Sequence, residues 1–214
     1  MIPNSSRPLL YLITDRRVLP PKKNKTDLAP LFDLVSRALE AGVDLVQVRE
    51  RDLPAKQLAG LVESLVGLAR GCNARVLVND RADVAACCGA GVHLTTRSMA
   101  PDIVRKTFGP DLLIGVSTHS MEEAVAAEEG EADFIVFGPV FETASKKIYG
   151  PPVGLELLEK VSGRLCIPVL ALGGIDMTNF RLPLERGAAG VAAISLFAAA
   201  EDLRSVVKHI KSAG

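Results

Sequence analysis

Short apolar runs alternate with longer amphipathic stretches along the whole chain. Runs of this length, bounded by polar or glycine-rich segments, are typical of strands buried on both faces of a parallel sheet. They predict eight strands, over Leu9–Thr14, Leu45–Arg49, Arg75–Asn79, Gly91–Leu94, Leu113–Ser117, Phe134–Gly138, Pro168–Leu172 and Gly190–Ser195.

The stretches between these runs carry apolar residues at helical spacing. The first helix is predicted to place Leu31, Val35 and Leu39 on one face and to end at Gly42, as a glycine C-cap would. The second is predicted to begin near Pro54, because proline suits a first helical turn. Later helices are predicted near residues 81–88, 100–107, 120–129, 154–162, 177–187 and 198–212.

Eight strands alternating with helices is the count of a (β/α)8 barrel. A doubly wound open sheet shares the alternation but usually stops at five or six strands, and no GxGxxG motif follows the first strand. We therefore predict the α/β class, with a single (β/α)8 TIM-barrel domain over residues 1–214.

Composition argues against several classes of function. Lys plus Arg and Asp plus Glu each number 25, so no overall field draws the chain to nucleic acid or to an anionic membrane. No apolar segment reaches the ~20 residues of a membrane helix, and residues 1–8 lack a signal-peptide pattern. We expect a cytoplasmic protein that binds neither nucleic acid nor membranes. Its cysteines, which show no CxxC spacing, are expected to be buried free thiols: Cys72, Cys87, Cys88 and Cys166.

Polar side chains follow the predicted strands where each ends, which is where such a barrel builds its active site. Arg49 and Arg51 lie two residues apart, so both are expected to face the barrel mouth, while Glu50 faces away. Two cations on one side need an anion, because burying unpaired charge is costly. The alternative is a structural ion pair between Arg49 and a carboxylate of a neighbouring strand.

Asn79 and Asp80 close the next predicted strand. A carboxylate beside cationic groups suits Mg²⁺ that bridges a diphosphate, because Mg²⁺ usually takes one or two protein carboxylates plus phosphate oxygens. The alternative is that Asp80 only caps a helix beginning at Arg81.

The segment after the sixth strand combines reactive-looking side chains with glycine and proline. Thr143, Ser145 and Lys146 offer two hydroxyls and an ammonium, which suit phosphate oxygens and a departing diphosphate. Residues 141–152 are therefore predicted to form an active-site flap. The basic segment 16–26 after the first strand is interpreted as a surface loop, with a lid over an anion as the alternative.

Two later strand ends point to phosphate. Gly173, Gly174, Ile194 and Ser195 lie where barrels often bind phosphate with backbone N–H groups. Glycine would let the backbone approach the ligand closely.

Three further polar residues are candidates for the site. Ser117 adds a hydroxyl at the end of the fifth strand. His93 and His119 are interpreted as structural hydrogen-bonding groups, with a general acid or base as the alternative. Since no Ser–His–Asp or Cys–His arrangement is evident, the site is predicted to stabilise charge rather than to supply a covalent nucleophile.

Together these motifs resemble a known family over nearly the whole chain. The matching segments are Tyr11–Asp15, Gln47–Arg51, Val78–Arg81, Gly91–Leu94, Gly115–His119, Phe137–Phe141 with Thr143–Lys146, Pro152–Leu155 and Ala171–Ile175. The sequence resembles thiamine phosphate synthase, also called thiamine-phosphate pyrophosphorylase, and its relative the thiazole tautomerase.

The resemblance implies an Mg²⁺-assisted transferase that joins hydroxymethylpyrimidine diphosphate to a thiazole phosphate and releases diphosphate, and it implies a homodimer. It assigns the pyrimidine diphosphate to Gln47, Arg49, Arg51, Asn79, Ser117 and Lys146, of which Arg49, Ser117 and Lys146 are the expected catalytic groups. It assigns Mg²⁺ to Asp80. It assigns the thiazole phosphate to Thr143, Ser145, Gly174, Ile194 and Ser195.

Some positions depart from the family pattern. Arg51 stands where lysine is usual, which keeps the charge but changes its geometry. Ser98 stands at the position of a second metal-binding aspartate, although Asp102 follows and Arg97 could supply positive charge directly. Pro139 replaces the catalytic histidine of the tautomerase. Two alternatives to the synthase remain: a tautomerase with His93 or His119 as base, and a non-catalytic binder of phosphate ligands.

Overall fold

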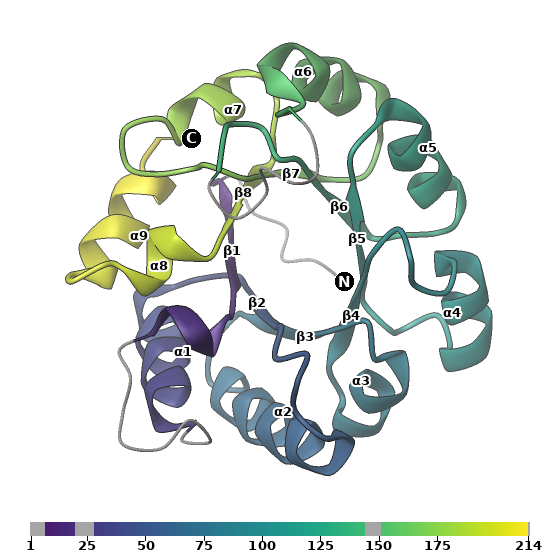
Figure 1. The fold of residues 1–214 in the computed structure, drawn as a ribbon, viewed down its shortest axis with the longest axis vertical. Helices are drawn as coiled ribbons and strands as arrows, with labels where there is room; N and C mark the ends of the chain where they lie inside the picture. Colours follow the sequence, from purple (N-terminus) through teal and green to yellow (C-terminus); the bar gives the residue numbers. More distant parts are fainter. Residues whose placement is uncertain (1–6, 20–27, 144–150, 214) are drawn as a thin grey trace.

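The computed structural model describes residues 7–19, 28–143 and 151–213. Its strands form one closed parallel barrel in chain order, seen end-on in Figure 1. They are β1 (Leu9–Ile13), β2 (Leu45–Val48), β3 (Arg75–Asn79), β4 (Gly91–Leu94), β5 (Ile114–Thr118), β6 (Phe134–Phe137), β7 (Val169–Leu172) and β8 (Gly190–Ala193). The ring closes where β8 pairs with β1, with Tyr11 opposite Ala192. The predicted (β/α)8 architecture is confirmed.

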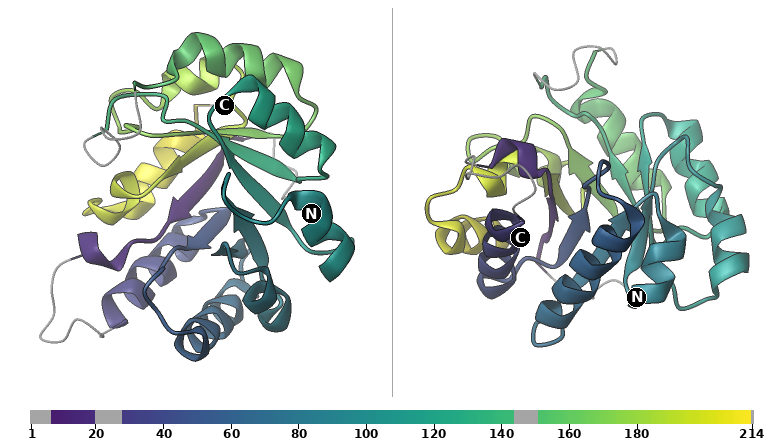
Figure 2. Two further views of the ribbon diagram at one scale, coloured as in Figure 1. Left: turned by 45° about the vertical axis from the view of Figure 1, so that its right-hand side comes forward. Right: turned by 60° about the horizontal axis from the view of Figure 1, so that its bottom comes forward.

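The helices lie around the outside of the barrel, as the views in Figure 2 show. They are α1 (Ala29–Ala41), α2 (Ala55–Ala69), α3 (Ala82–Cys88), α4 (Pro101–Phe108), α5 (Met121–Glu129), α6 (Gly154–Arg164), α7 (Arg181–Glu185), α8 (Ser195–Ala198) and α9 (Leu203–Lys211), with a 3₁₀ turn η1 (Arg16–Val18). Gly42 ends α1 in the left-handed region, as predicted, with φ 95°. None of the helices in the described ranges is long and apolar enough to cross a membrane.

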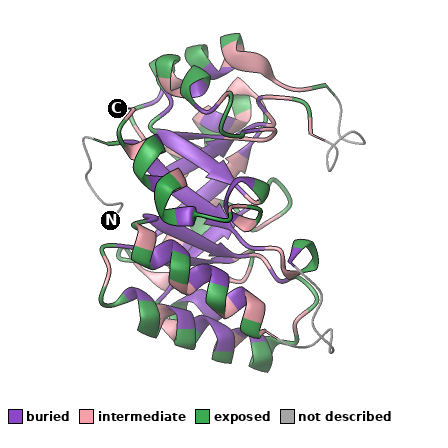
Figure 3. Ribbon diagram, turned by 90° about the vertical axis from the view of Figure 1, so that its left-hand side faces the viewer, coloured by how far each residue is buried: buried purple, intermediate pink, exposed green. Residues whose placement is uncertain are grey.

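Alternate residues of each strand face two different cores. Outward-facing residues such as Leu10, Leu12 and Val46 pack against the buried faces of the helices. Inward-facing residues such as Tyr11 and Phe134 fill the barrel interior. Figure 3 shows the strands buried and the outer helix faces exposed. The interior is thus a packed core, and ligands can be bound only at its ends.

Two predicted helices are wrong in their bounds, for local reasons. The helix expected at 177–187 begins only at Arg181, because the Asp176 carboxylate accepts hydrogen bonds from the backbone N–H and hydroxyl of Thr178 and so holds a turn. The helix expected at 198–212 begins only at Leu203, because the side chain of Asp202 accepts from Ser205 N and caps α9; the separate short helix α8 ends at Ala198.

The expected burial of the cysteines is also wrong. All four are free thiols, but Cys87 and Cys166 are exposed, and Cys72 and Cys88 are only half-buried. On α3, Val84 and Ala85 take the buried positions. The face of α3 that carries Cys87 is therefore turned to solvent.

Candidate active site

The inward-facing amide side chains of β2 and β3 meet near the carboxyl ends of these strands. Gln47 is 2% exposed, and its Nε2 donates to Asn79 Oδ1 across 3.1 Å. Both face the barrel interior, because Leu45 and Leu77, two residues earlier, belong to the inner core. The structure therefore brings together two predicted ligand residues, and Asn79 Nδ2 is placed to donate to an anion.

Arg49 lies just beyond β2 and is half-buried, whereas Arg51 is exposed. Asp15, after the neighbouring strand β1, approaches Arg49 NH1 at 3.5 Å. The structural alternative, an ion pair with a neighbouring strand, is thus partly present. This contact is long, because both Asp15 carboxylate oxygens already accept shorter hydrogen bonds from Arg17, at 2.8 and 2.6 Å.

Asp15 compensates the positive charge of Arg17 more fully than that of Arg49. Hydrogen bonding and the charge of Asp15 raise the pKa of the Arg17 guanidinium. Burial lowers the pKa of the Arg49 guanidinium, and the nearby cation Arg51 lowers it further, against the attraction of Asp15. Arg49 is therefore a cation whose surroundings favour an added anion.

A buried carboxylate anchors this edge from the outer side of the barrel. Glu50 is 4% exposed and accepts hydrogen bonds from Thr14 Oγ1 at 2.8 Å, from Arg16 NH1 at 2.8 Å and from Arg16 N. The Thr14 hydroxyl in turn accepts from Arg49 N at 3.0 Å. Glu50 faces away from the mouth, as predicted, but the sequence analysis assigned it no partners. The network fixes the backbone from which Arg49 and Arg51 project.

Replacing Glu50 by glutamine is expected to lower the free energy of unfolding by about 2 kcal/mol, measured by urea unfolding. Both Glu50 oxygens accept hydrogen bonds, so the amide group of glutamine would face a donor. Asp52→Asn is the control, because Asp52 also pairs with Arg16 but its side chain is 67% exposed. That control should cost less than about 0.5 kcal/mol. Equal losses in the two variants would contradict the anchoring role.

Asp80 follows β3 and is exposed, with a backbone φ of 62° in the left-handed region. Aspartate tolerates this conformation better than most residues, although it is uncommon and concentrates at functional sites. The capping alternative is wrong: α3 begins at Ala82 with Arg81 as its N-cap, and no described side chain caps it.

A metal ion at Asp80, which stays a prediction, would have to take most of its ligands from the substrate. Within the described ranges, no three or more His, Cys, Asp or Glu residues form a metal-binding group. Ser98 Oγ accepts from Thr95 N at 2.8 Å and lies 3.0 Å from Thr95 Oγ1, so it closes the turn after β4. Asp80 alone suits Mg²⁺ whose remaining ligands are phosphate oxygens and water, the usual arrangement for this ion.

His93 and Ser117 form a hydrogen-bonded pair from β4 to β5. His93 Nε2 lies 2.8 Å from Ser117 Oγ, and its Nδ1 lies 3.2 Å from the Tyr11 hydroxyl. Burial lowers the pKa of His93 to about 3, so its ring is neutral near pH 7. With both nitrogens bonded and the ring 1% exposed, His93 has the hydrogen-bonding role expected of it.

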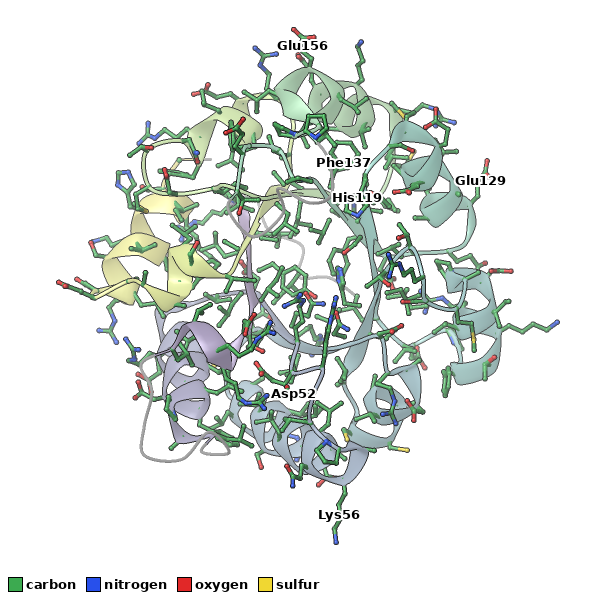
Figure 4. All side chains as sticks on the ribbon, viewed as in Figure 1. Asp52, Lys56, His119, Glu129, Phe137 and Glu156 are labelled. Carbon is green, nitrogen blue, oxygen red and sulfur yellow. The ribbon has the colours of Figure 1, made fainter. Side chains whose placement is uncertain are left out.

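His119 lies beyond β5, and its backbone N donates to Glu123 Oε2 at 2.6 Å. Its Nδ1 pairs with the carbonyl oxygen of Gly138, so this ring too is tied to the scaffold. Figure 4 shows His119 and Asp52 on opposite sides of the ring of strands.

The β7 and β6 ends pack tightly together. Gly173 and Gly174 have φ values of 100° and 64°, where other residues are strained. A Cβ on Gly174 would lie 2.5 Å from the carbonyl oxygen of Glu142, and one on Gly173 would lie 2.5 Å from Pro139 Cβ. These glycines are therefore needed for packing against the segment that leads to Thr143, and their role toward a ligand stays a prediction.

The remaining predicted site residues divide into two groups. Ile194 packs against the inner core, and Ser195 begins α8 and is exposed. The N-cap residue of α8 is Ile194, whose apolar side chain makes no cap bond, and the phosphate-binding role of this strand end stays a prediction. Ser145 and Lys146, most of the predicted flap 141–152 and most of the segment 16–26 lie outside the described residues.

Comparison with known proteins agrees with the resemblance. The family described as thiamine monophosphate synthase matches residues 10–197. A protein named thiamine-phosphate synthase from Chlorobium phaeovibrioides is 40% identical over 191 residues, which cover 89% of this chain and 86% of that protein. A thiamine-phosphate synthase from Roseiflexus sp. is 37% identical over 203 residues, with coverages of 94% and 83%.

Solved structures give the same result. The thiamine phosphate pyrophosphorylase from Pyrococcus furiosus superposes with a TM-score of 0.81 and 35% identity, covering 96% of this chain and 94% of that one. A 3-hexulose-6-phosphate synthase, 14% identical with a TM-score of 0.70, shares the fold alone. The extent of the family match, together with these relatives, shows that the chain belongs to the thiamine monophosphate synthase family.

Proposed function

We propose that the chain joins hydroxymethylpyrimidine diphosphate to hydroxyethylthiazole phosphate, forming thiamine phosphate and diphosphate. The observation that carries the proposal is the cation Arg49 beside Arg51, poorly compensated by Asp15, at a mouth that also holds Gln47 and Asn79. Such a group of donors suits an anion with several oxygens, and a diphosphate leaving group is one.

In this reaction the bond between the pyrimidine methylene carbon and the diphosphate oxygen breaks, and the diphosphate keeps the electron pair. The thiazole nitrogen then forms a bond to the resulting cation. Arg49 and Arg51 bind the leaving oxygens and stabilise their growing charge, while Asn79 donates a further hydrogen bond. Lys146, outside the described residues, is assigned to the same leaving group.

The proposal also includes a Mg²⁺ ion at Asp80. Asp80 would hold Mg²⁺ together with diphosphate oxygens. Bound there, Mg²⁺ would neutralise charge on the leaving group. The second substrate is assigned to the β6–β8 side of the mouth, where Thr143, Gly174, Ile194 and Ser195 would hold its phosphate.

The test is an assay with both substrates, with and without Mg²⁺, that measures thiamine phosphate. Product that forms only when both substrates and Mg²⁺ are present supports the proposal; binding of the phosphate ligands without product supports the non-catalytic alternative. The tautomerase alternative is less well supported with His93 as its base, because burial lowers the pKa of His93 to about 3 and both ring nitrogens are hydrogen-bonded.

Asp80→Asn is expected to raise the Mg²⁺ concentration for half-maximal rate by about tenfold or more, because it removes the ligand's charge. Asp83→Asn is the matched control, since the exposed Asp83 lies on α3 three residues away and pairs with Arg81. An unchanged Mg²⁺ titration in Asp80→Asn would place the metal elsewhere.

A homodimer and a cytoplasmic location complete the proposal. The first rests on the family resemblance and the second on the sequence. Light scattering of the purified chain tests the homodimer, since a mass of one chain would contradict it.

A further inference from the structure

Three side chains connect the barrel interior to the mouth through hydrogen bonds. The Tyr11 hydroxyl lies 3.2 Å from His93 Nδ1, and His93 Nε2 lies 2.8 Å from Ser117 Oγ. Tyr11 and His93 are essentially inaccessible, at 0% and 1% exposed, while Ser117 is half-buried near the end of β5. The hydrogen bonding of Tyr11 and His93 can therefore affect Ser117, which is a predicted ligand residue.

Packing holds the His93 ring in one orientation. Its centroid lies 5.6 Å from that of Tyr11 and 6.1 Å from that of Phe134. Gly115, beside it on β5, leaves the necessary space, because a Cβ there would lie 2.9 Å from His93 Nδ1 and 2.3 Å from Phe134 Cζ. Because the rings of Tyr11 and Phe134 pack against that of His93, the His93 ring cannot turn easily, and each of its nitrogens keeps its own partner.

The partners determine which nitrogen carries the hydrogen. Neutral imidazole has one donor and one acceptor nitrogen. Among the described residues, the Tyr11 hydroxyl has His93 Nδ1 as its one hydrogen-bond partner. A buried O–H that cannot donate is costly, whereas an oxygen that accepts nothing is tolerated more easily. Tyr11 therefore donates to Nδ1, and the ring hydrogen lies on Nε2.

The direction of the second bond follows from the first. Nε2–H donates to Ser117 Oγ, so the hydroxyl hydrogen of Ser117 has no acceptor in His93. A serine hydroxyl in this state both accepts from the scaffold and donates outward. At the mouth, the atom best suited to receive that hydrogen is a negatively charged oxygen.

We propose that Tyr11 and His93 are positioning residues that fix Ser117 as a hydrogen-bond donor, so that this point of the mouth selects a diphosphate oxygen. The identity of the ligand rests on the proposed function. The direction of the two hydrogen bonds does not, and it can be measured without ligand or turnover.

Nitrogen-15 NMR of the full chain tests the direction. The chain has three histidines, so the His93 signals are assigned by their loss in His93→Gln. We expect protonated Nε2 and bare Nδ1 at pH 7, and a shift toward Nδ1 protonation in Tyr11→Phe, which removes the donor. Protonated Nδ1 in the unchanged chain would overturn the proposal.

Calorimetry with inorganic diphosphate and Mg²⁺ tests the consequence. A glutamine amide nitrogen can take the place of Nε2, whereas an asparagine amide reaches only the place of Nδ1. We expect Ser117→Ala and His93→Asn each to weaken binding about tenfold, and the double variant to be no weaker than either. His93→Gln should stay within about threefold of the unchanged chain, because it restores a donor to Ser117.

Additive losses, or equal losses in His93→Asn and His93→Gln, would show that His93 acts only through the fold. Unfolding curves identify variants that fail to fold, and the NMR result on the unchanged chain then decides. Failure of the unchanged chain to bind diphosphate would count against the proposed function and against the ligand named here, while the NMR measurement still decides the direction of the bonds.

Discussion

Arg49→Ala is expected to lower kcat/KM for the pyrimidine diphosphate by about 10² to 10³-fold. Removing one member of a partly buried charge pair typically costs ~2–5 kcal/mol, and ~1.4 kcal/mol corresponds to a factor of ten. Of the two arginines, Arg49 is half-buried and Arg51 is exposed, so Arg51 cannot replace Arg49 at the same position. The measurement is steady-state kinetics with the thiazole phosphate at saturation.

Two variants control this experiment. Arg49→Lys keeps the charge but loses the bidentate fork, so a loss of about tenfold is expected. Arg37→Ala removes an exposed arginine that pairs with Asp33 on α1, and its activity should stay within about twofold. Full activity of Arg49→Ala would contradict the role of Arg49 in diphosphate binding, on which the proposed function rests.

The second large effect is on stability at acid pH. In the folded chain burial lowers the pKa of His93 to about 3, whereas an unfolded histidine titrates near 6.5. The unfolded chain therefore binds the proton first as pH falls. The free energy of unfolding is therefore unaffected by His93 above pH ~6.5. As the pH falls toward ~3, proton uptake by His93 in the unfolded chain lowers it by roughly 3 kcal/mol at pH 4 and by roughly 5 kcal/mol in total.

Unfolding free energies of the chain and of His93→Gln between pH 4 and 7 measure this effect. Glutamine does not titrate, so the variant should lose most of the slope between pH 4 and 6.5. His209→Gln is the control, because His209 is exposed on α9, and its slope should match that of the unchanged chain. Asp15 and Asp52, whose pKa values arginine hydrogen bonds lower, add acid sensitivity below pH ~4 in all three proteins. Parallel slopes in all three would mean that His93 is not held neutral.

The barrel could be predicted because its strands are buried on both sides and so appear as separate apolar runs. Strand ends were less certain: Arg49 and Gly138 lie beyond β2 and β6, where the chain leaves the sheet. The helix errors came from single aspartates, Asp176 and Asp202, whose side chains bond to nearby backbone N–H groups. Such bonds end or start helices without changing the hydrophobic pattern.

The sequence predicted the sides to which Gln47, Asn79 and Glu50 point, but not the partners that hold them. Alternation along a strand gives the sides that Gln47 and Asn79 face, because it depends only on the chain itself. The partners of Glu50 come from the neighbouring strand, so they require the register of β1 and β2. Tyr11 and His93 are further removed, since β1 and β4 are not adjacent and meet only across the interior. No spacing in the sequence encodes that contact.

The pairing of β1 with β8 has a consequence for synthesis of the protein. Leu9 and Gly190 are partners. The edge of β1 that faces away from β2 therefore stays unpaired until the ribosome has made β8. Until then the nascent chain carries two open sheet edges, which can pair with other chains. We expect chains truncated before β8 to aggregate, because the edges of β1 and β7 then stay unpaired.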